Sequence, residues 1–445
     1  MSRLAPLSGF PEWTPEGRVI ERHVLDLLRS EFELHGFAEI ETRAVEPLDR
    51  LAGDSDAAKE IYALRRLRAE EGEGDSGMGL HFDLTVPFAR YVEEFAGQLA
   101  FPFRRYQIQK VWRGERPQDG RFREFYQADI DVVARETLPA HFESEVAIVA
   151  ARALARLPIP PVQMRVNNRV VVEESYRAMG ITDVIGTLRT VDKMAKIGER
   201  GVREALSRPG GAGPGAVDGV LALASISGTP DVVSTAVRAQ AERFGGASDA
   251  LREGLGRLAA VVTAIDAAIP GRAVADLSIA RGLDYYTGCV FETLLEGHED
   301  LGSICSGGRY DSLVAGGGYP GVGISVGVSR LVARILSAGL AVASRGVPTA
   351  VLVAVVDEDA RAGSEAIANR LRVRGISVEV APTAAKFGKQ IQHADRRGIP
   401  FVWFPASAAG ESDEVKDIRS GDQVPADADA WMPPEADLRP RVERR

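Results

Sequence analysis

A long β-hairpin is the feature that most restricts how this chain can fold. Residues 103–112 and 123–133 each alternate apolar and polar side chains, as strands do. The segment between them, 114–120, is rich in glycine, proline and charge, which is typical of a turn. Strands joined in this way pair antiparallel. Because the neighbouring elements show no strict β-α-β alternation, the sequence predicts an α+β domain built on an antiparallel sheet.

The residues before the hairpin show further elements. Apolar side chains recur at helical spacing over 15–34, which predicts an amphipathic helix, and 37–42 is expected to be extended. The acidic, glycine-rich segment 70–79 is expected to be a loop, followed by a strand over 80–84. Val86-Pro87 then opens a helix, since proline suits the first helical turn.

The rest of the chain divides into three parts. Alanine-rich helical periodicity over about 170–269 indicates a helical insertion, which a flexible loop over 207–219 is expected to interrupt. Strand-like sequence returns over 274–328 and precedes a helix over 330–340. After a boundary near 344–348, a β-α-β-α-β pattern predicts a small, mostly parallel α/β domain. The tail 424–445, rich in proline and charge, is expected to be mobile.

Composition restricts the class of protein. The 445 residues are 45% hydrophobic and 26% charged, the balance of a soluble globular protein. No apolar run approaches the ~20 residues that span a bilayer, and the N-terminus does not resemble a secretory signal. We therefore expect a cytoplasmic protein without membrane contact. The net charge of −9 does not indicate a nucleic-acid binder, although seven basic and three acidic residues make residues 104–124 locally basic.

Metal and disulfide sites are not expected. The only cysteines, Cys289 and Cys305, are too few for a disulfide framework and are expected to be buried, inert thiols. The six histidines are scattered without ligand spacing, so no metal site built from protein side chains is predicted. There is also no P-loop, and the glycines of 321–327 lie in a strand-like pattern. If ATP binds, arginines must hold its phosphates.

Six segments share a resemblance. Residues 112–131, with Glu-Arg-Pro-Gln-Asp-Gly-Arg at 115–121, resemble motif 2 of class II aminoacyl-tRNA synthetases in its histidyl form, and 80–91 resembles the segment before motif 2. Residues 281–292 and 303–312 resemble the two histidine-specific motifs, and 322–331 resembles motif 3. The segments 386–395 and 416–421 resemble the anticodon-binding domain. The chain is thus identified, over nearly its whole length, as a member of the histidyl-tRNA synthetase family.

The resemblance implies an architecture and an activity. Residues 1–343 would form the class II catalytic domain with its helical insertion, and 348–445 the anticodon-binding α/β domain. The enzyme would use ATP to activate L-histidine as histidyl-adenylate and would transfer histidine to the 3′ end of tRNA(His). Mg²⁺ would bridge the outer phosphates of ATP. A homodimer formed through the motif 1 region is also implied.

The resemblance also implies residue roles. Arg113 and Arg281 would be catalytic, facing the α-phosphate from opposite sides. The imidazole would lie between Asp131 and Tyr286, which suits a ring with two nitrogens. The long basic loop of the hairpin would meet the tRNA acceptor end through Arg116 and Gln118. The remaining assignments are histidine contacts by Asp83, Leu84, Thr85, Arg113, Gln127, Asp131, Arg281, Tyr285 and Tyr286, and ATP contacts by Arg113, Glu115, Arg121 and Arg330.

Several residues allow a plainer interpretation or depart from the family pattern. Asp83 could cap the helix that begins near Val86, and Gly307 and Gly308 could serve close packing only. The departures from the family pattern are His81, Arg43, Ser306 and Ser329. Two rival functions stay open at this point: a non-catalytic paralogue that regulates histidine biosynthesis, and a binding module that senses tRNA.

Overall fold

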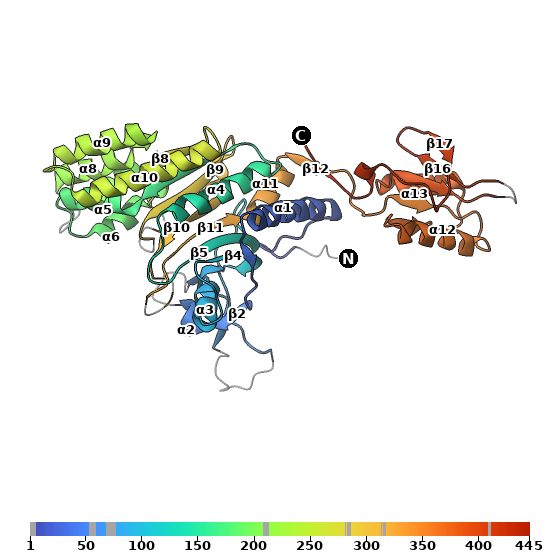
Figure 1. The fold of residues 1–445 in the computed structure, drawn as a ribbon, viewed down its shortest axis with the longest axis horizontal. Helices are drawn as coiled ribbons and strands as arrows, with labels where there is room; N and C mark the ends of the chain where they lie inside the picture. Colours follow the sequence, from blue (N-terminus) through green and yellow to red (C-terminus); the bar gives the residue numbers. More distant parts are fainter. Residues whose placement is uncertain are drawn as a thin grey trace. The chain divides into compact units, whose positions relative to one another are not determined.

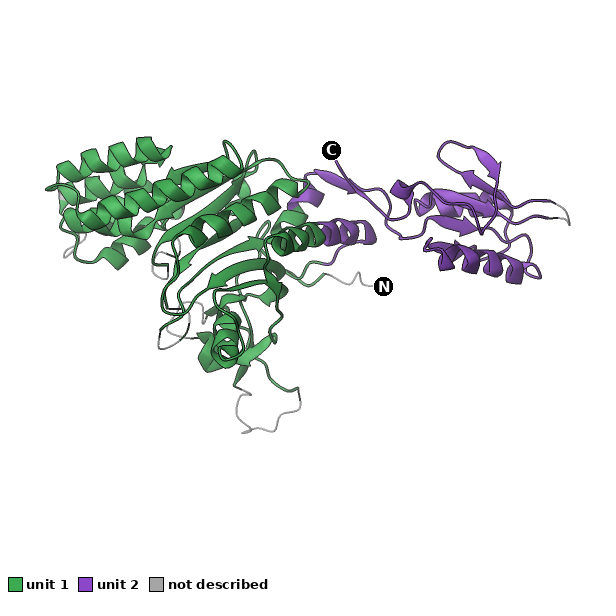
Figure 2. Cartoon of the chain, in the orientation of Figure 1, with its two compact units in different colours: residues 1–11, 24–333 green, residues 12–23, 334–445 purple. Residues whose placement is uncertain are grey.

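The computed structural model describes residues 6–52, 59–67, 77–207, 213–280, 282, 286–312, 314, 317–407 and 411–445. The chain forms two compact units (Figure 2). Unit 1 comprises Met1–Pro11 and Val24–Ala333, and unit 2 comprises Glu12–His23 and Arg334–Arg445. The candidate site lies in unit 1.

The sheet of unit 1 is mostly antiparallel. In the described residues it has nine strands in the order β1-β4-β5-β11-β10-β9-β6-β8-β7. The predicted hairpin is confirmed, because β4 pairs antiparallel with β5 from Phe103 opposite Val133 to Trp112 opposite Glu124. Parallel pairing occurs between β1 and β4 and between β6 and β8. The strands are β1 Ala38–Glu39, β4 Phe103–Trp112, β5 Glu124–Val133, β6 Val162–Asn168, β7 Ser227–Gly228, β8 Ala273–Asp276, β9 Cys289–Leu295, β10 Cys305–Tyr310 and β11 Gly321–Gly327.

Helices cover this sheet. The predicted helix over 15–34 is confirmed as α1 Pro15–Leu34, which buries Val24, Leu28 and Phe32 completely. Figure 1 shows α4 His141–Arg156 and α10 Asp249–Ala268 lying along the sheet. Both helices pack through apolar stripes, as amphipathic helices do. The other elements near the site are α2 Leu48–Ala52, α3 Thr85–Phe95, α11 Val328–Ser337, the 3₁₀ turn η2 Glu299–Leu301, and the strand pair β2 Val45–Pro47 and β3 Met78–Leu80.

Two predictions for the segment before α3 are wrong. The strand expected over 80–84 ends at Leu80, because Asp83 turns the chain into α3 by accepting a hydrogen bond from the Val86 N–H at 3.1 Å. The loop expected over 70–79 gives way to β3 at Met78, where Glu46 pairs with Gly79. Residues 70–76 lie outside the described part of the chain.

The helical block contains α5 to α10. The expected flexible loop over 207–219 is wrong from Pro214 onward, because α8 begins there with proline in its first turn and buries Val217 and Val220. Residues 208–212 lie outside the described part. The helices not yet given are α5 Arg169–Ala178, α6 Val184–Val191, α7 Met194–Leu206, α8 Pro214–Ala224 and α9 Pro230–Glu242.

Unit 2 contains the predicted β-α-β-α-β pattern. Its sheet has the order β14-β13-β15-β16-β17, in which the first three strands are parallel and the last two are antiparallel to their neighbours. Trp403 and Leu371 lie in its core without exposure. Its elements are β12 Ala341–Ala343, β13 Val351–Val353, α12 Arg361–Val373, β14 Val378–Val380, α13 Phe387–Arg396, β15 Phe401–Phe404, β16 Glu414–Asp417, β17 Gln423–Pro425, η3 Glu435–Asp437 and β18 Val442–Arg444.

The prediction of a mobile tail is wrong. Arg374 Nη1 donates hydrogen bonds to the carbonyls of Ala428 at 2.9 Å and Trp431 at 2.6 Å. The Trp431 ring centroid lies 5.6 Å from that of Trp403. The last strand, β18, pairs antiparallel with β12. Buried aromatic area and charge-assisted hydrogen bonds therefore hold a segment whose composition alone suggests mobility.

Deleting residues 426–445 is expected to destabilise unit 2 by about 2 kcal/mol or more, since it removes the partly buried Trp431 from its contact with the core. The deletion removes Trp431 and also Asp437, which binds Arg419 at 2.8 and 2.9 Å. Urea unfolding of the full chain and the deleted chain, followed by tryptophan fluorescence, measures the change. Superimposable unfolding curves would show that the tail contributes nothing to stability.

Candidate active site

Strand β5 forms the floor of the site. Successive side chains on a strand point to opposite faces, so Gln127, Asp129 and Asp131 share one face. Their neighbours on β4 and β11 extend this face into a continuous polar surface across three strands. The opposed residues are Gln109, Gln107 and Arg105 on β4, and Gly327, Ser325 and Gly323 on β11.

Asp131 is held from two sides. Arg105 Nη2 lies 2.6 Å from Asp131 Oδ2, and the Tyr310 hydroxyl donates to Oδ1 at 2.8 Å. Burial raises the pKa of Asp131, while Arg105 and the Tyr310 hydrogen bond lower it. A Cβ on Gly323 would lie 1.9 Å from Oδ1, so glycine is needed beside this carboxylate. Arg105 is completely buried, and its guanidinium lies 4.1 Å from the Phe88 ring centroid. A buried arginine thus fixes a carboxylate at the bottom of the site.

A small cavity of about 30 Å³ opens beside Asp131. Tyr286 forms one wall, and its ring lies so close to Gly308 that a Cβ there would approach a ring carbon to 2.7 Å. The predicted histidine contacts Thr85, Asp131 and Tyr286 therefore meet in one place. The lining residues are Thr85, Asp129, Asp131, Tyr286, Ser306, Gly307, Tyr310, Gly323, Ile324 and Ser325.

A larger cavity of about 260 Å³ adjoins the small one, since Ser306 and Ser325 line both. It brings together Arg113, Glu115, Arg121 and Arg330, the four residues predicted to bind ATP, along with Gln127. The other lining residues are Glu60, Gly120, Phe122, Phe125, Ser303, Ile304, Cys305, Ser306, Ser325 and Gly327. Three guanidinium groups in one cavity suit a polyphosphate, because each can contact two phosphate oxygens.

Backbone carbonyls orient two of these arginines. Arg113 Nε donates to the Phe82 carbonyl at 3.0 Å, and its guanidinium lies 5.1 Å from the Phe125 ring centroid. Arg330 Nε donates to the Gly120 carbonyl at 3.0 Å. Arg121 Nη1 lies 3.7 Å from Glu115 Oε2. The arginine side chains are thus positioned by the protein before any ligand arrives.

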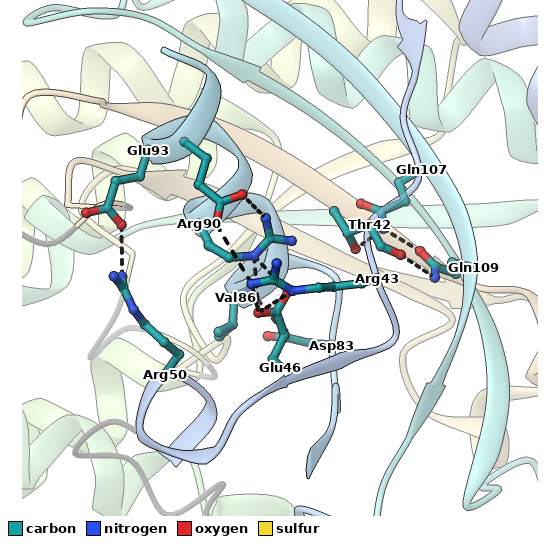
Figure 3. Close-up of polar contacts among 11 residues, drawn as sticks. Thr42, Arg43, Glu46, Arg50, Asp83, Val86, Arg90, Glu93, Gln107 and Gln109 are labelled. Atoms are coloured by element: carbon teal, nitrogen blue, oxygen red, sulfur yellow. Dashed lines mark hydrogen bonds and ion pairs between the residues drawn. The ribbon is translucent and has the colours of Figure 1, made fainter. Parts of the chain in front are cut away.

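The segment with Asp83 lies against a buried ion pair (Figure 3). Asp83 caps α3 through Val86, as the helix-cap interpretation predicts, and burial raises its pKa. Within α3, Arg90 Nε donates to Glu46 Oε1 at 2.8 Å and to Oε2 at 3.1 Å. Arg43 also reaches Glu46, at 3.2 Å. Glu46 on β2 therefore fixes the helix that carries Thr85.

Replacing Glu46 with glutamine is expected to lower the free energy of unfolding by about 3 kcal/mol, because the buried Arg90 guanidinium then keeps only the half-exposed Glu94, at 2.7 Å, as its counter-charge. Chemical denaturation measures this loss. Glu93→Gln is the matched control, since its ion pair with Arg50 is exposed and contributes about 1 kcal/mol at most. Equal losses in both variants would contradict a structural role for the buried pair.

Not all predicted site residues lie in the cavities. Leu84 is completely buried, and Arg116 and Gln118 are exposed on the hairpin loop, outside both cavities. Arg281 and Tyr285 lie outside the described residues. Ion pairs balance part of the charge of the local basic segment, because Arg104 pairs with Glu145 and Lys110 pairs with Glu124.

The departures from the family pattern have local structural explanations. His81 is completely buried, its Nε2 lies 2.7 Å from the Lys110 carbonyl, and burial lowers its pKa. The Ser329 hydroxyl accepts a hydrogen bond from the Tyr126 N–H at 2.9 Å. Ser306 lines both cavities. Both cysteines are buried free thiols whose pKa is raised by burial, as expected.

Comparison with known proteins decides the family. The family model described as histidyl-tRNA synthetase matches residues 9–331, and an anticodon-binding domain model matches 350–424. The chain belongs to the histidyl-tRNA synthetase family. It is 57% identical to a histidine–tRNA ligase of Cutibacterium acnes, over 99% of both chains. It is 55% identical to one of Micrococcus luteus, over 100% of this chain and 99% of the other.

Structural comparison agrees with this family. A crystal structure of histidyl-tRNA synthetase from Nostoc sp. PCC 7120 is 34% identical, has a TM-score of 0.83, and covers 96% of this chain and 98% of its own. The near-complete match to ligases favours a catalytic member over a non-catalytic paralogue. Within the described residues, no helix has the length and apolarity required to cross a membrane, and no group of three or more potential metal ligands occurs.

The sequence did not single out several residues that build the site. Arg105 and Tyr310 hold Asp131, Ser325 lines both cavities, and Glu60 lines the larger one. One signal for Arg105 was present, since a hairpin closed near 112 and 124 places residue 105 opposite 131. Tyr310 comes from a distant segment, so the hairpin pattern could not reveal its contact.

Proposed function

We propose that the two adjoining cavities carry out both steps of histidyl-tRNA synthesis. The small cavity would take the imidazole of L-histidine and the larger one would take ATP. The supporting observation is the continuity of the two cavities, with a fixed carboxylate in one and Arg113, Arg121 and Arg330 in the other. The activated carboxyl group of histidine would then lie at their junction.

In the first step, an oxygen of the histidine carboxylate forms a bond to the α-phosphorus of ATP. The bond from that phosphorus to the bridging oxygen breaks, and pyrophosphate leaves. Arg113 would neutralise charge on the α-phosphate, while Arg121 and Arg330 would bind the outer phosphates. Arg281 would approach the α-phosphate from the other side, a role that rests on the resemblance of its motif. No protein base is needed, so positioning and charge stabilisation would supply the catalysis.

Recognition of histidine would use the floor of the site. Asp131 would accept a hydrogen bond from a ring N–H, and Tyr286, with Gln127 and Tyr285, would complete the contacts to the side chain. Asp83 and Thr85 would bind the α-ammonium group beside Leu84. A pocket with such fixed polar groups can discriminate by about 10⁴ against amino acids that leave them unpaired.

The residues around the larger cavity fit a magnesium ion that arrives with ATP. Mg²⁺ is usually held by one or two carboxylates together with phosphate oxygens. Glu60 and Glu115 line the larger cavity and are the carboxylates that would hold it. When bound, the ion would neutralise charge on the outer phosphates.

The second step requires tRNA(His). Arg116 and Gln118 on the exposed hairpin loop would contact the acceptor end, and residues 348–445 would bind the anticodon. The terminal adenosine hydroxyl would attack the carbonyl carbon of the adenylate, releasing AMP. We place this function in the cytoplasm and in a homodimer formed through the segment that carries Arg43.

Aminoacylation with labelled histidine and the tRNA pool of a bacterial relative tests the whole function. We expect charging of one tRNA species by histidine alone among the twenty amino acids. Charging with another amino acid, or none with folded protein, would overturn the proposal.

Arg281→Ala is expected to abolish adenylate formation while ATP binding stays measurable. The reason is that the lost guanidinium would act on charge developing at the α-phosphate. Pyrophosphate exchange and binding of an ATP analogue report the two properties separately. If ATP binding and folding are lost along with exchange, Arg281 is structural.

A further inference from the structure

Asp129 is a second carboxyl group at the floor of the small cavity. It lies two residues before Asp131 on the same face of β5 and lines that cavity. Only 4% of the residue is exposed, and its Oδ1 atom has no hydrogen-bond partner among the described residues. A buried acceptor without a partner costs about 1–3 kcal/mol, so the Oδ1 atom is available to a hydrogen-bond donor on a ligand.

The surroundings make the two carboxyl groups chemically different. Asp131 contacts both Arg105 and the Tyr310 hydroxyl. Asp129 has no such pair of partners: Gln127 Nε2 donates to the Ser325 hydroxyl at 2.5 Å, and the Ser325 hydroxyl is the side chain that hydrogen-bonds Asp129. The pKa of Asp129 is raised to about 7, chiefly by burial; Arg105 and a hydrogen bond with Ser325 lower it, while the charges of Asp131 and Asp83 raise it. Two carboxyl groups that share one cation seldom ionise together.

The charged and titratable groups around Asp129 come from each packed element. Arg105 lies on β4, Asp131 on β5 and Cys305 on β10, and β11 contributes only the neutral Ser325. Asp83 acts on Asp129 from the segment before α3, and the Tyr286 hydroxyl has its pKa raised partly by Asp129. When Asp129 and Asp131 are both ionised, Arg105 balances only one of them, so these three side chains carry one net negative charge.

We propose that Asp129 is a second residue that recognises the imidazole, and that Asp129 and the bound ring share one proton in addition to the ring N–H that Asp131 accepts. The proposal rests on the function proposed above. Asp131 accepts the N–H of one ring nitrogen, and the shared proton lies between Asp129 Oδ1 and the other ring nitrogen. The complex is electrically balanced by this proton: Arg105 offsets Asp131, and the proton offsets Asp129. No covalent bond forms or breaks in the process except that of the transferred proton.

The proposal has a measurable consequence in proton uptake. Above pH 7 free Asp129 and free histidine, whose ring has a pKa near ~6.5, are mostly unprotonated, so binding must take up nearly one proton. The affinity for histidine should therefore fall with rising pH, approaching tenfold per pH unit by pH 8. The affinity falls as the pH rises because the complex binds more protons than the separate protein and histidine do.

Isothermal titration of the full-length protein with L-histidine, from pH 6.5 to 8.5 in buffers of different ionisation enthalpy, measures the uptake directly. Asp129→Asn cannot titrate, so its uptake at pH 8 should be nearly one proton smaller than that of the wild type. The histidine α-amino group contributes equally to both proteins and cancels in the difference. Asp276→Asn is the control for a buried carboxylate, since Asp276 is 4% exposed, pairs with Arg165 and lies outside the cavity. Its uptake should match the wild type.

Equal uptake by wild type and Asp129→Asn would overturn the proposal. If Asp129→Asn fails to fold, the wild type alone decides, because an affinity for histidine independent of pH between 7 and 8.5 would also overturn it. The same titrations distinguish this outcome from failure of the function proposed above. If that function is wrong, the wild type would not bind histidine in preference to other amino acids at any pH.

Discussion

Replacing Arg113 with alanine is expected to lower the rate of histidine-dependent ATP–pyrophosphate exchange by about 10³-fold. A preorganised donor aimed at developing charge typically contributes 10²–10³ in rate, and Arg113 would contact both the α-phosphate and the histidine carboxylate. Its side chain is already oriented by the Phe82 carbonyl and the Phe125 ring. Arg113→Lys keeps the charge but loses the bidentate geometry, so we expect it to recover only a small part of the rate.

Arg116→Ala is the matched control for Arg113, because it removes the same charge from the same hairpin. Arg116 is exposed and lies outside both cavities. Its loss should leave exchange within about twofold of the wild type while slowing transfer to tRNA. Equal effects of the two substitutions on exchange would show that only the overall charge of the hairpin matters.

Replacing Asp131 with asparagine is expected to reduce kcat/KM for histidine by about 10³-fold or more while ATP affinity changes little. The asparagine amide lacks the negative charge that would face the ring, and Arg105 loses the carboxylate 2.6 Å away. Breaking such a buried pair also costs about 3–5 kcal/mol, part of which should appear as lowered stability. Steady-state exchange at varied histidine and varied ATP separates the two substrates.

Removing both members of the ion pair distinguishes recognition from folding. Arg105→Met together with Asp131→Asn also removes the cation that has lost its partner at 2.6 Å, so stability should recover in part while histidine activation stays low. Recovery of both properties would contradict a direct role for Asp131 in binding the ring. The measurements are thermal unfolding and exchange on the same preparations.

Local patterns made much of the fold predictable. The hairpin of β4 and β5 follows from the alternation of apolar and polar residues around a turn-rich segment, and α1 follows from one apolar stripe. The tail was predicted wrongly because its order comes from contacts distant in sequence, such as those between Arg374 and the carbonyl of Trp431. Composition describes what a segment can do alone, and it does not describe the surface against which the segment packs.

The sequence predicted some residues of the candidate site and missed others for the same reason. Asp131 and the arginines proposed to bind phosphate belong to segments with specific sequence patterns, and those that the structure describes gather around two adjoining cavities. The support of Asp131 by Arg105 and Tyr310 depends on strand register and on packing between distant segments. Position 323 shows the limit of prediction from sequence. The reason that it must be glycine is seen only when the structure places the Asp131 carboxylate against it.

Histidine-dependent exchange of labelled pyrophosphate into ATP tests the central claim most directly. The two adjoining cavities predict exchange that requires histidine, is not supported by the other amino acids, and is lost in Arg113→Ala and Asp131→Asn. Exchange that is absent from the folded wild-type protein, or that proceeds equally well without histidine, would contradict the assignment of these cavities.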